Sequence, residues 1–151
     1  MEDFKSIDDI LDFAIQSEQE AVEFYSDLAS NAINKEMKDV FQQFAAEEMG
    51  HKAKLLKIKN EGTFEVRSEQ IVDLKIADYL IDIEATPNMS YEDALIVAMK
   101  KEKSAFKLYT NLAAKAPNDS MRDIFLSLAQ EESKHKLRFE IEYDDFVLRE
   151  N

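Results

Sequence analysis

The sequence repeats itself once without a gap, and this repeat limits the folds that the chain can adopt. The segment AIQSEQEAVEFYSDLA, Ala14 to Ala29, aligns with AMKKEKSAFKLYTNLA, Ala98 to Ala113, at an offset of 84 residues. At the same offset MKDVFQQFAAEEMGHK (37–52) aligns with MRDIFLSLAQEESKHK (121–136). Self-similarity at a fixed offset marks a structural unit that is built more than once. Residues 1–151 are therefore predicted to form one domain made of two similar halves.

Each half is predicted to be a pair of α-helices. Two Gly and two Pro in 151 residues are too few for several β-hairpins, so the composition indicates an all-α fold. The cap-like residues Ser6 and Ser90 begin the first helix of each half, and Gly62 ends the second helix of the first half. The predicted helices cover about residues 6–31, 34–61, 90–116 and 119 to the end, with fraying after Tyr143. The two repeats then span about residues 6–61 and 90–143.

The crossover at about residues 62–89 is too long for a tight turn between helices. A shorter extra helix is expected within it, from about Ser68 to Glu84. The short loops inside each half make its helices antiparallel, and the long crossover then gives the connectivity of a four-helix bundle. The extra helix has more apolar residues than one face needs, so we expect it to cap the bundle or to contact a second copy in a homodimer. These residues are Ile71, Val72, Leu74, Ile76, Leu80, Ile81 and Ile83.

The charge balance excludes several classes of function. The chain has 19 Lys plus Arg and 32 Asp plus Glu, a net charge of 19 − 32 = −13, which disfavours binding to nucleic acid or to an anionic membrane surface. The acidic N-terminal sequence MEDFKSIDD is unlike a signal peptide, and no apolar run is long enough to span a membrane, so a cytoplasmic location is expected. The absence of cysteine excludes thiolate ligands and a cysteine nucleophile.

The apolar seams of the four predicted helices are interrupted at one level by polar residues. Residues spaced alternately by four and three positions lie on one face of a helix. On the first predicted helix of each half, this face is apolar except for one glutamate. On the second predicted helix of each half, it is apolar except for a Glu-x-x-His pair. Apolar residues precede and follow these positions on the same face, so their side chains should point into the bundle. The six interrupting residues are Glu18, Glu48, His51, Glu102, Glu132 and His135.

Carboxylates that are buried together require cations. An unpaired buried carboxylate costs several kcal/mol, and the seams contain no Lys or Arg at this level. Two divalent cations balance the charge of the four carboxylates, and two neutral imidazoles add nitrogen ligands. The Glu-x-x-His spacing places both side chains on one helix face, about a turn apart. We therefore predict a two-metal site; the alternatives are buried ion pairs or a solvated charged face.

Residues next to these candidate ligands have expected supporting roles. Four alanines one step along the seams leave space at the site: Ala14, Ala21, Ala98 and Ala105. Tyr25 and Tyr109 follow the first glutamate of their half by seven residues. Their hydroxyls either approach a ligand carboxylate or a bound oxygen, as candidate catalytic groups, or belong to core packing. Glu47 and Glu131 leave the seam, so we expect them to support the ligands or to lie at the surface.

These motifs resemble the ferritin-like superfamily of di-iron carboxylate proteins, and most closely the rubrerythrin family. In that family a glutamate followed by Ala at three and Tyr at seven residues precedes a helix with Glu-x-x-His, and both halves show this pattern over about residues 6–55 and 90–139. The resemblance implies that the six interrupting residues bind two iron ions per chain. It also implies a non-haem di-iron oxidoreductase of the oxidative-stress type that reduces hydrogen peroxide or dioxygen.

The sequence departs from the family pattern at two points. Rubrerythrins usually carry a rubredoxin-like domain with four cysteines, and this chain has no cysteine. Electrons are therefore expected from a separate donor, for which a rubredoxin-like protein is one candidate. Rubrerythrins also commonly have an additional glutamate where this sequence has Ala105, so the resemblance implies six ligand side chains here instead of seven.

Other functions remain open at the level of sequence. One is a ferroxidase or iron-handling protein, in which Fe(II) is the substrate and acidic surface charge attracts it. Another is a structural bundle that metals stabilise without turnover. A dimanganese or mixed Fe/Mn pair is an alternative to iron, because nitrogen and oxygen ligands alone do not choose among these metals.

Overall fold

The computed structural model describes residues 6–62, 79, 86 and 89–150. These residues form four α-helices and no strand, which confirms the predicted all-α class. The helices are α1 (Ile7–Ser30), α2 (Lys35–Glu61), α4 (Tyr91–Ala114) and α5 (Asp119–Glu150). The chain divides into two compact units, Met1–Leu74 and Lys75–Asn151, each of which contains one of the two predicted helix pairs. None of the helices in the described ranges is both long and apolar enough to cross a membrane.

A side chain caps the start of each of the four described helices. Ser6 Oγ accepts a hydrogen bond from the Asp9 backbone N–H at 3.1 Å, and Ser90 Oγ accepts one from Asp93 at 3.1 Å. Asn34 and Asn118 use Oδ1 in the same way, at 2.8 Å each. These bonds satisfy N–H groups that have no partner within the helix. The predicted starts of the helices are thereby confirmed to within a residue.

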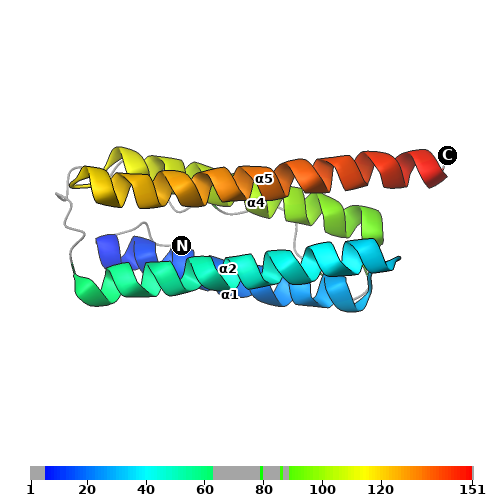
Figure 1. The fold of residues 1–151 in the computed structure, drawn as a ribbon, viewed down its shortest axis with the longest axis horizontal. Helices are drawn as coiled ribbons and strands as arrows, with labels where there is room; N and C mark the ends of the chain where they lie inside the picture. The colour runs from blue at the N-terminus through cyan, green and yellow to red at the C-terminus, as the bar shows by residue number, and fades with distance from the viewer. Residues whose placement is uncertain (1–5, 63–78, 80–85, 87–88, 151) are drawn as a thin grey trace. The chain divides into compact units, whose positions relative to one another are not determined.

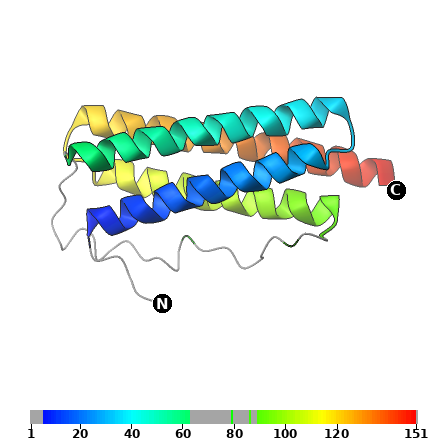
Figure 2. The same ribbon diagram turned by 90° about the horizontal axis from the view of Figure 1, so that it is seen from below.

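The first unit contains the α1–α2 hairpin, whose two helices run antiparallel side by side (Figures 1 and 2). Gly62 ends α2 in the left-handed conformation, with φ at 63°, which glycine adopts without the strain that a Cβ would cause. The predicted seam is buried on both helices, although Ile7 at its start is half-buried and the adjacent Ile10 is fully buried instead. This hairpin therefore presents one continuous apolar face that the predicted glutamates and histidine interrupt.

The second unit contains the α4–α5 hairpin, in which α4 ends two residues earlier than predicted and α5 runs to Glu150, in agreement with the predicted helix from 119 to the end. The prediction that α5 frays after Tyr143 is wrong, because side chains beyond that level pack against the start of α4. Tyr91 Oη donates a hydrogen bond to Glu142 Oε1 at 3.2 Å, and its ring lies 5.1 Å from that of Phe146. Tyr143 Oη donates to Glu92 Oε1 at 3.1 Å. These two opposed Tyr–Glu bonds join the end of α5 to the first turn of α4.

Tyr79 lies against α4 within the second unit. Its side chain is 4 % exposed, its hydroxyl accepts a hydrogen bond from Asn111 Nδ2 at 2.8 Å, and its carbonyl accepts one from Ser104 Oγ. Lys107 Nζ lies 5.9 Å from the centre of the ring, within cation–π range. The extra helix predicted at about 68–84 falls on residues outside the described part of the chain, apart from this tyrosine.

Candidate metal centre

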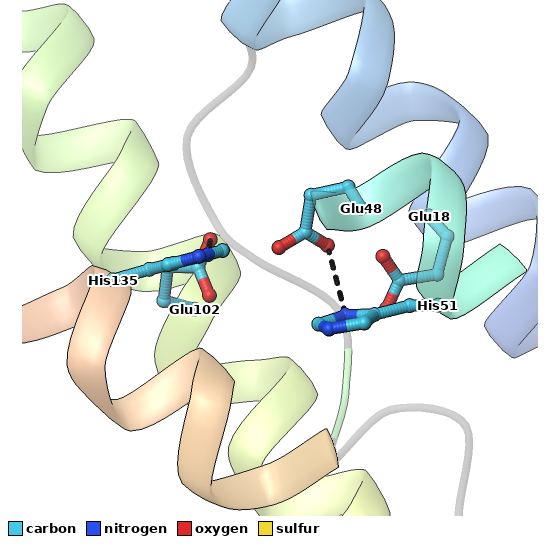
Figure 3. A network of polar contacts seen from close by, with 5 residues as sticks. All are labelled: Glu18, Glu48, His51, Glu102 and His135. Atoms are coloured by element: carbon cyan, nitrogen blue, oxygen red, sulfur yellow. Dashed lines mark ion pairs between the residues drawn. The ribbon is translucent and has the colours of Figure 1, made fainter. Parts of the chain in front are cut away.

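The first hairpin brings three of the predicted ligands together. Glu18 comes from the middle of α1, and Glu48 and His51 come from one face of α2. His51 Nδ1 lies 3.7 Å from Glu18 Oε1 and 3.7 Å from Glu48 Oε2, and Figure 3 shows both carboxylates beside the imidazole ring. One ligand atom from each of the three residues lies within 4.8 Å of the others, a spacing that a single metal ion can bridge.

The second hairpin repeats this arrangement with the equivalent residues. Glu102 comes from α4, and Glu132 and His135 come from α5. His135 Nδ1 lies 3.5 Å from Glu102 Oε1. Figure 3 labels both side chains, one from each helix of this hairpin. The ligand atoms of these three residues also lie within 4.8 Å of one another. Each hairpin therefore forms the same half-site, with one glutamate from its first helix and a Glu-x-x-His pair from its second.

All six side chains are buried. Their relative exposure is between 1 and 2 %, a degree of burial that Glu almost never reaches unless it is paired or bound to a metal. Ala14 and Ala98, one heptad step before the first glutamate of each hairpin, are 0 % exposed. Small side chains at these positions leave volume beside the carboxylates, whereas leucine would fill it.

Burial and mutual contact shift the pKa values in the first half-site. Desolvation raises the pKa of Glu18 well above its usual 4.5, and the neighbouring Glu48 raises it further. Burial lowers the pKa of His51, but the Glu18 and Glu48 carboxylates, each 3.7 Å from its Nδ1, outweigh this effect and raise the pKa to about 11. In the metal-free protein a positively charged imidazole therefore holds together carboxylates that would otherwise repel each other.

The donor atoms fit a metal centre. Each of the six residues has one buried oxygen or nitrogen atom that makes no hydrogen bond within the described part of the protein, although each residue makes other polar contacts. An unsatisfied buried polar atom costs about 1–3 kcal/mol, and the six atoms, at equivalent positions of the two hairpins, are of the kinds that can bind a cation. Carboxylate oxygen and imidazole nitrogen suit iron, manganese or zinc, with no soft ligand present.

The candidate catalytic tyrosines are both in the core. Tyr25 is 0 % and Tyr109 is 1 % exposed. The Tyr25 ring lies edge-on to Phe44 with centroids 6.4 Å apart, and Tyr109 stacks on Phe125, also at 6.4 Å. Both rings thus have packing roles, and a role of their hydroxyls in catalysis stays a prediction. Glu47 lies outside the cluster of ligand atoms and accepts a hydrogen bond from Gln43 at 3.2 Å.

Two polar contacts, one beside the first half-site and one near the end of α5, were not predicted from the sequence. Lys52, directly after His51, donates a hydrogen bond from Nζ to Gln19 Oε1 at 2.7 Å and so joins α2 to α1 beside the half-site. Glu142 is 5 % exposed and bound to Tyr91. One more step of three residues beyond Phe139 along the α5 seam reaches Glu142, so the sequence contained this signal. The sequence contained no such signal for the hydrogen bond between Lys52 and Gln19, because single Lys and Gln residues on helix flanks are common.

Comparison with known structures shows the class of fold. The chain is similar to a crystal structure from Thermotoga maritima, described as a ferritin-like diiron-carboxylate protein, with a TM-score of 0.74 and 20 % sequence identity. The similarity covers 92 % of this chain and 95 % of the other. The protein thus has the ferritin-like fold, with two buried half-sites whose residue types suit metal binding.

The family follows from the sequence match. The family model for rubrerythrin matches residues 9–86 and 93–151, which include all six predicted ligands. The chain belongs to the rubrerythrin family. No significant match was found among curated proteins.

Proposed function

We propose that the protein is a di-iron oxidoreductase that reduces hydrogen peroxide, or dioxygen, with electrons from a separate donor. The observation that carries this proposal is the burial of four carboxylates and two imidazoles, each 1–2 % exposed, at equivalent positions of a repeat. Membership of the rubrerythrin family supports iron and redox chemistry. In this proposal the two half-sites together bind two iron ions; manganese is the other metal that such ligands accept readily.

The six side chains hold the metal pair by charge and by orientation. A bound iron pair supplies two electrons, one from each ion. Four carboxylates balance four positive charges and favour the higher oxidation state, which carries more charge. The Glu-x-x-His spacing presents a carboxylate and an imidazole from the same face of α2 and of α5, so the helix backbone fixes their relative positions before metal binds.

Protons and water are controlled by the same cluster. Reduction of one peroxide molecule to two water molecules consumes two electrons and two protons. The raised pKa values of Glu18 and His51 mean that the metal-free cluster holds protons, and cations that take their place release them. Leu11 and Leu55 on the same seams are 1 % and 0 % exposed, and such an apolar shell keeps bulk water away and strengthens electrostatic interactions.

Metal content and the reaction with peroxide test this function together. Protein loaded with Fe(II) under anaerobic conditions is expected to contain two irons per chain and to be oxidised by peroxide within about a second in a stopped-flow instrument. Replacement of Glu48→Gln with Glu132→Gln preserves side-chain shape and should lower metal content and the oxidation rate. The control is Glu47→Gln with Glu131→Gln, the same change one residue away, which should leave both unchanged.

Three outcomes would contradict the proposal in different ways. Absence of stoichiometric metal would remove the metal centre altogether. Rapid oxidation by dioxygen with release of Fe(III) and no reaction with peroxide would indicate iron handling, with Fe(II) as the substrate. Two bound metals that raise the melting temperature but are not oxidised would indicate a structural role.

A further inference from the structure

The outer surface of α4 carries positive charge on an acidic protein. From Ala94 to its end at Ala114 the helix has four lysines, and its single carboxylate there, Glu102, is 1 % exposed. Lys100, Lys103 and Lys107 are spaced by three and four residues, which places them on one helix face. We call these three residues the lysine stripe. Lys103 and Lys107 are exposed, and Lys100 is half-buried.

The repeat shows that the fold does not require lysine at these positions. The residues of α1 equivalent to the lysine stripe are Gln16, Gln19 and Glu23. In the first hairpin Lys52 Nζ donates to Gln19 Oε1 at 2.7 Å, and Gln19 Nε2 donates to Glu23 Oε1 at 3.2 Å. These two hydrogen bonds join α1 to α2 and connect the positive charge of Lys52 to the negative charge of Glu23 through Gln19.

In the second hairpin the same three positions are all lysine. Gln19, Glu23 and Lys52 correspond to Lys103, Lys107 and Lys136. Lys136 donates instead to Glu140 on its own helix at 2.9 Å. The second hairpin thus has three positive charges at the positions where the first has a network across helices. Lys107 among them lies 5.9 Å from the centre of the Tyr79 ring, and an acidic partner on this face of α4 would be attracted by these charges.

The lysine stripe lies beside the second half-site. Lys103 directly follows Glu102, and Lys136 directly follows His135. A helix with its side chains is about 10 Å wide, so a partner on this face of α4 comes within about one helix diameter of the Glu102 carboxylate. Phe106, between Lys103 and Lys107 in sequence, is 42 % exposed and offers an aromatic contact of the kind that is enriched in protein interfaces.

We propose that the lysine stripe and Phe106 form the docking surface for an acidic redox protein that supplies electrons to the metal centre. The inference rests on the proposed function, in which each peroxide molecule removes two electrons. Two one-electron transfers restore them, and each transfer oxidises one donor molecule and reduces one Fe(III) to Fe(II). With a net charge of −13 the chain repels an anionic donor elsewhere, so local attraction at α4 would also orient it.

A protein partner fits this surface better than a nucleic acid. The lysine stripe covers eight residues of helix, Lys100 to Lys107, and the seven steps between its ends span about 10 Å at 1.5 Å per residue. Three cations over this length neutralise few phosphates, and a polyanion also meets the acidic remainder of the chain. A small acidic protein needs only a patch of this size for a transient encounter.

Charge substitution copied from the other hairpin tests the surface without disturbing the fold. The test variant is Lys103→Gln with Lys107→Glu, which introduces the residues that α1 already has at these positions. The control is Lys35→Gln with Lys38→Glu, an equal change of net charge at exposed positions near the start of α2. The probe is a rubredoxin of negative net charge. Reduced methyl viologen, a small cation, serves as the reference reductant.

Binding and electron transfer should change together. At moderate salt, we expect the affinity of the test variant for oxidised rubredoxin to be about tenfold lower than that of wild type. We expect its rate of reduction by reduced rubredoxin to be about tenfold lower as well. The control variant should stay within about twofold of wild type. For wild type, the rubredoxin rate should fall as ionic strength rises from about 0.05 to about 0.5 M, since screening weakens local attraction.

The results that overturn the docking surface differ from those that overturn the function. Equal rubredoxin binding by the two variants, a wild-type rate that rises with salt as repulsion by the net charge predicts, or a preference of the stripe for an oligonucleotide would each overturn docking. The proposed function fails separately if protein reduced by methyl viologen is not oxidised by peroxide. Loss of rubredoxin binding in the test variant alone supports the docking surface in either case.

Discussion

The two hairpins carry the same ligands in opposite electrostatic surroundings. The segment Gln16–Glu23 of α1 has three carboxylates and no cation, a charge of −3. The equivalent segment Lys100–Lys107 of α4 has four lysines and one glutamate, or 4 − 1 = +3. Only the glutamate that belongs to the candidate metal centre is charged identically in both. The candidate ligands and the apolar seams are therefore the same in both copies of the repeat. The residues on the outer flanks of the helices differ between the copies, so they are available for other roles.

The hairpins also differ in how their helices are joined. Beside its half-site the first hairpin has the Lys52–Gln19 bond, and near the end of α2 an ion pair of Lys59 with Asp12. The second hairpin is joined at the end of α5 by the two opposed Tyr–Glu bonds of Tyr91 and Tyr143. The same backbone arrangement is thus stabilised by charge in one copy and by aromatic hydroxyls in the other. Substitutions that exchange residues between the copies separate ligand function from these differences.

Removal of one histidine from either hairpin is the strongest test of their equivalence. His51→Ala and His135→Ala should each reduce iron content and slow oxidation by peroxide at least about 100-fold, since loss of a mere supporting group costs about 10–100-fold. Metal analysis and stopped-flow kinetics measure both effects. Ser133→Ala, an exposed change between Glu132 and His135, is the control. Full activity in either histidine variant would show that one half-site is dispensable.

The stability of the metal-free protein should fall as the pH rises. The pKa of Glu18 is raised above 4.5, and that of His51 is raised from 6.5 to about 11, so the folded chain binds these protons more tightly than the unfolded chain. The contribution of His51 is complete below about pH 6.5 and is lost as the pH rises through about 11. Glu18 acts in the same direction from about pH 4.5 upward.

Urea unfolding of the metal-free protein at pH 6, 8 and 10 measures this dependence. The variant Glu18→Gln with His51→Gln removes both titrating groups and should flatten the decline, which isolates their share from the rest of the chain. A wild-type protein whose stability rises from pH 6 to pH 10 relative to this variant would contradict the prediction. Iron binding should show the opposite trend, because protons compete with the metal.

Substitution of the two buried tyrosines by phenylalanine distinguishes a packing role from a catalytic role of their hydroxyls. Tyr25→Phe and Tyr109→Phe each remove one hydroxyl from a ring that is 0 or 1 % exposed, which should cost about 1 kcal/mol of stability. If the hydroxyls act on a ligand or on bound oxygen, peroxide oxidation should also slow by about tenfold. Stopped-flow rates compared at equal iron content decide between these roles, and unchanged rates in both variants would leave the tyrosines with packing alone.

Exchange of the flank residues should alter stability modestly. Gln19→Lys gives α1 the residue that α4 has at this position, breaks the bond to Lys52 and places two ammonium groups together, at a cost of about 1 kcal/mol. The reverse change, Lys103→Gln, removes a like charge beside Lys136 and should be neutral or slightly stabilising. Urea midpoints with unchanged slopes measure both. An equal loss in the two variants would show that the hairpins do not differ here.

Effects of a similarly small size are expected at the two glycines, which occur only in the first hairpin. Gly50→Ala within α2 should add about 0.5–1 kcal/mol of stability, because a Cβ there meets nothing within 4 Å and restricts the unfolded chain. Gly62→Ala should lower stability by about 1 kcal/mol, since φ is 63°. Thermal unfolding of metal-free protein measures both. Shifts of the same sign would contradict this distinction.

The buried clusters of Glu and His and most helix boundaries were predictable from the sequence because local chemistry decides them. Ser6, Asn34 and Ser90 cap helices through their own side chains, and Gly62 supplies a left-handed residue. Glu-x-x-His fixes a shared face by helix periodicity alone. The fraying of α5 after Tyr143 was predicted wrongly, because Tyr91 and Phe146 stabilise this end from positions far apart in the chain.

The sequence by itself determined the repeat, the helical class and which six polar side chains leave the solvent, since periodicity and burial cost depend on the order of residues. Tertiary structure decided which partners the flank residues find. Lys52 reaches Gln19 across 33 residues of chain, whereas Lys136 binds Glu140 one turn away. The physical reason is that long polar side chains have many rotamers, and only the packed neighbouring helix determines which contact is made.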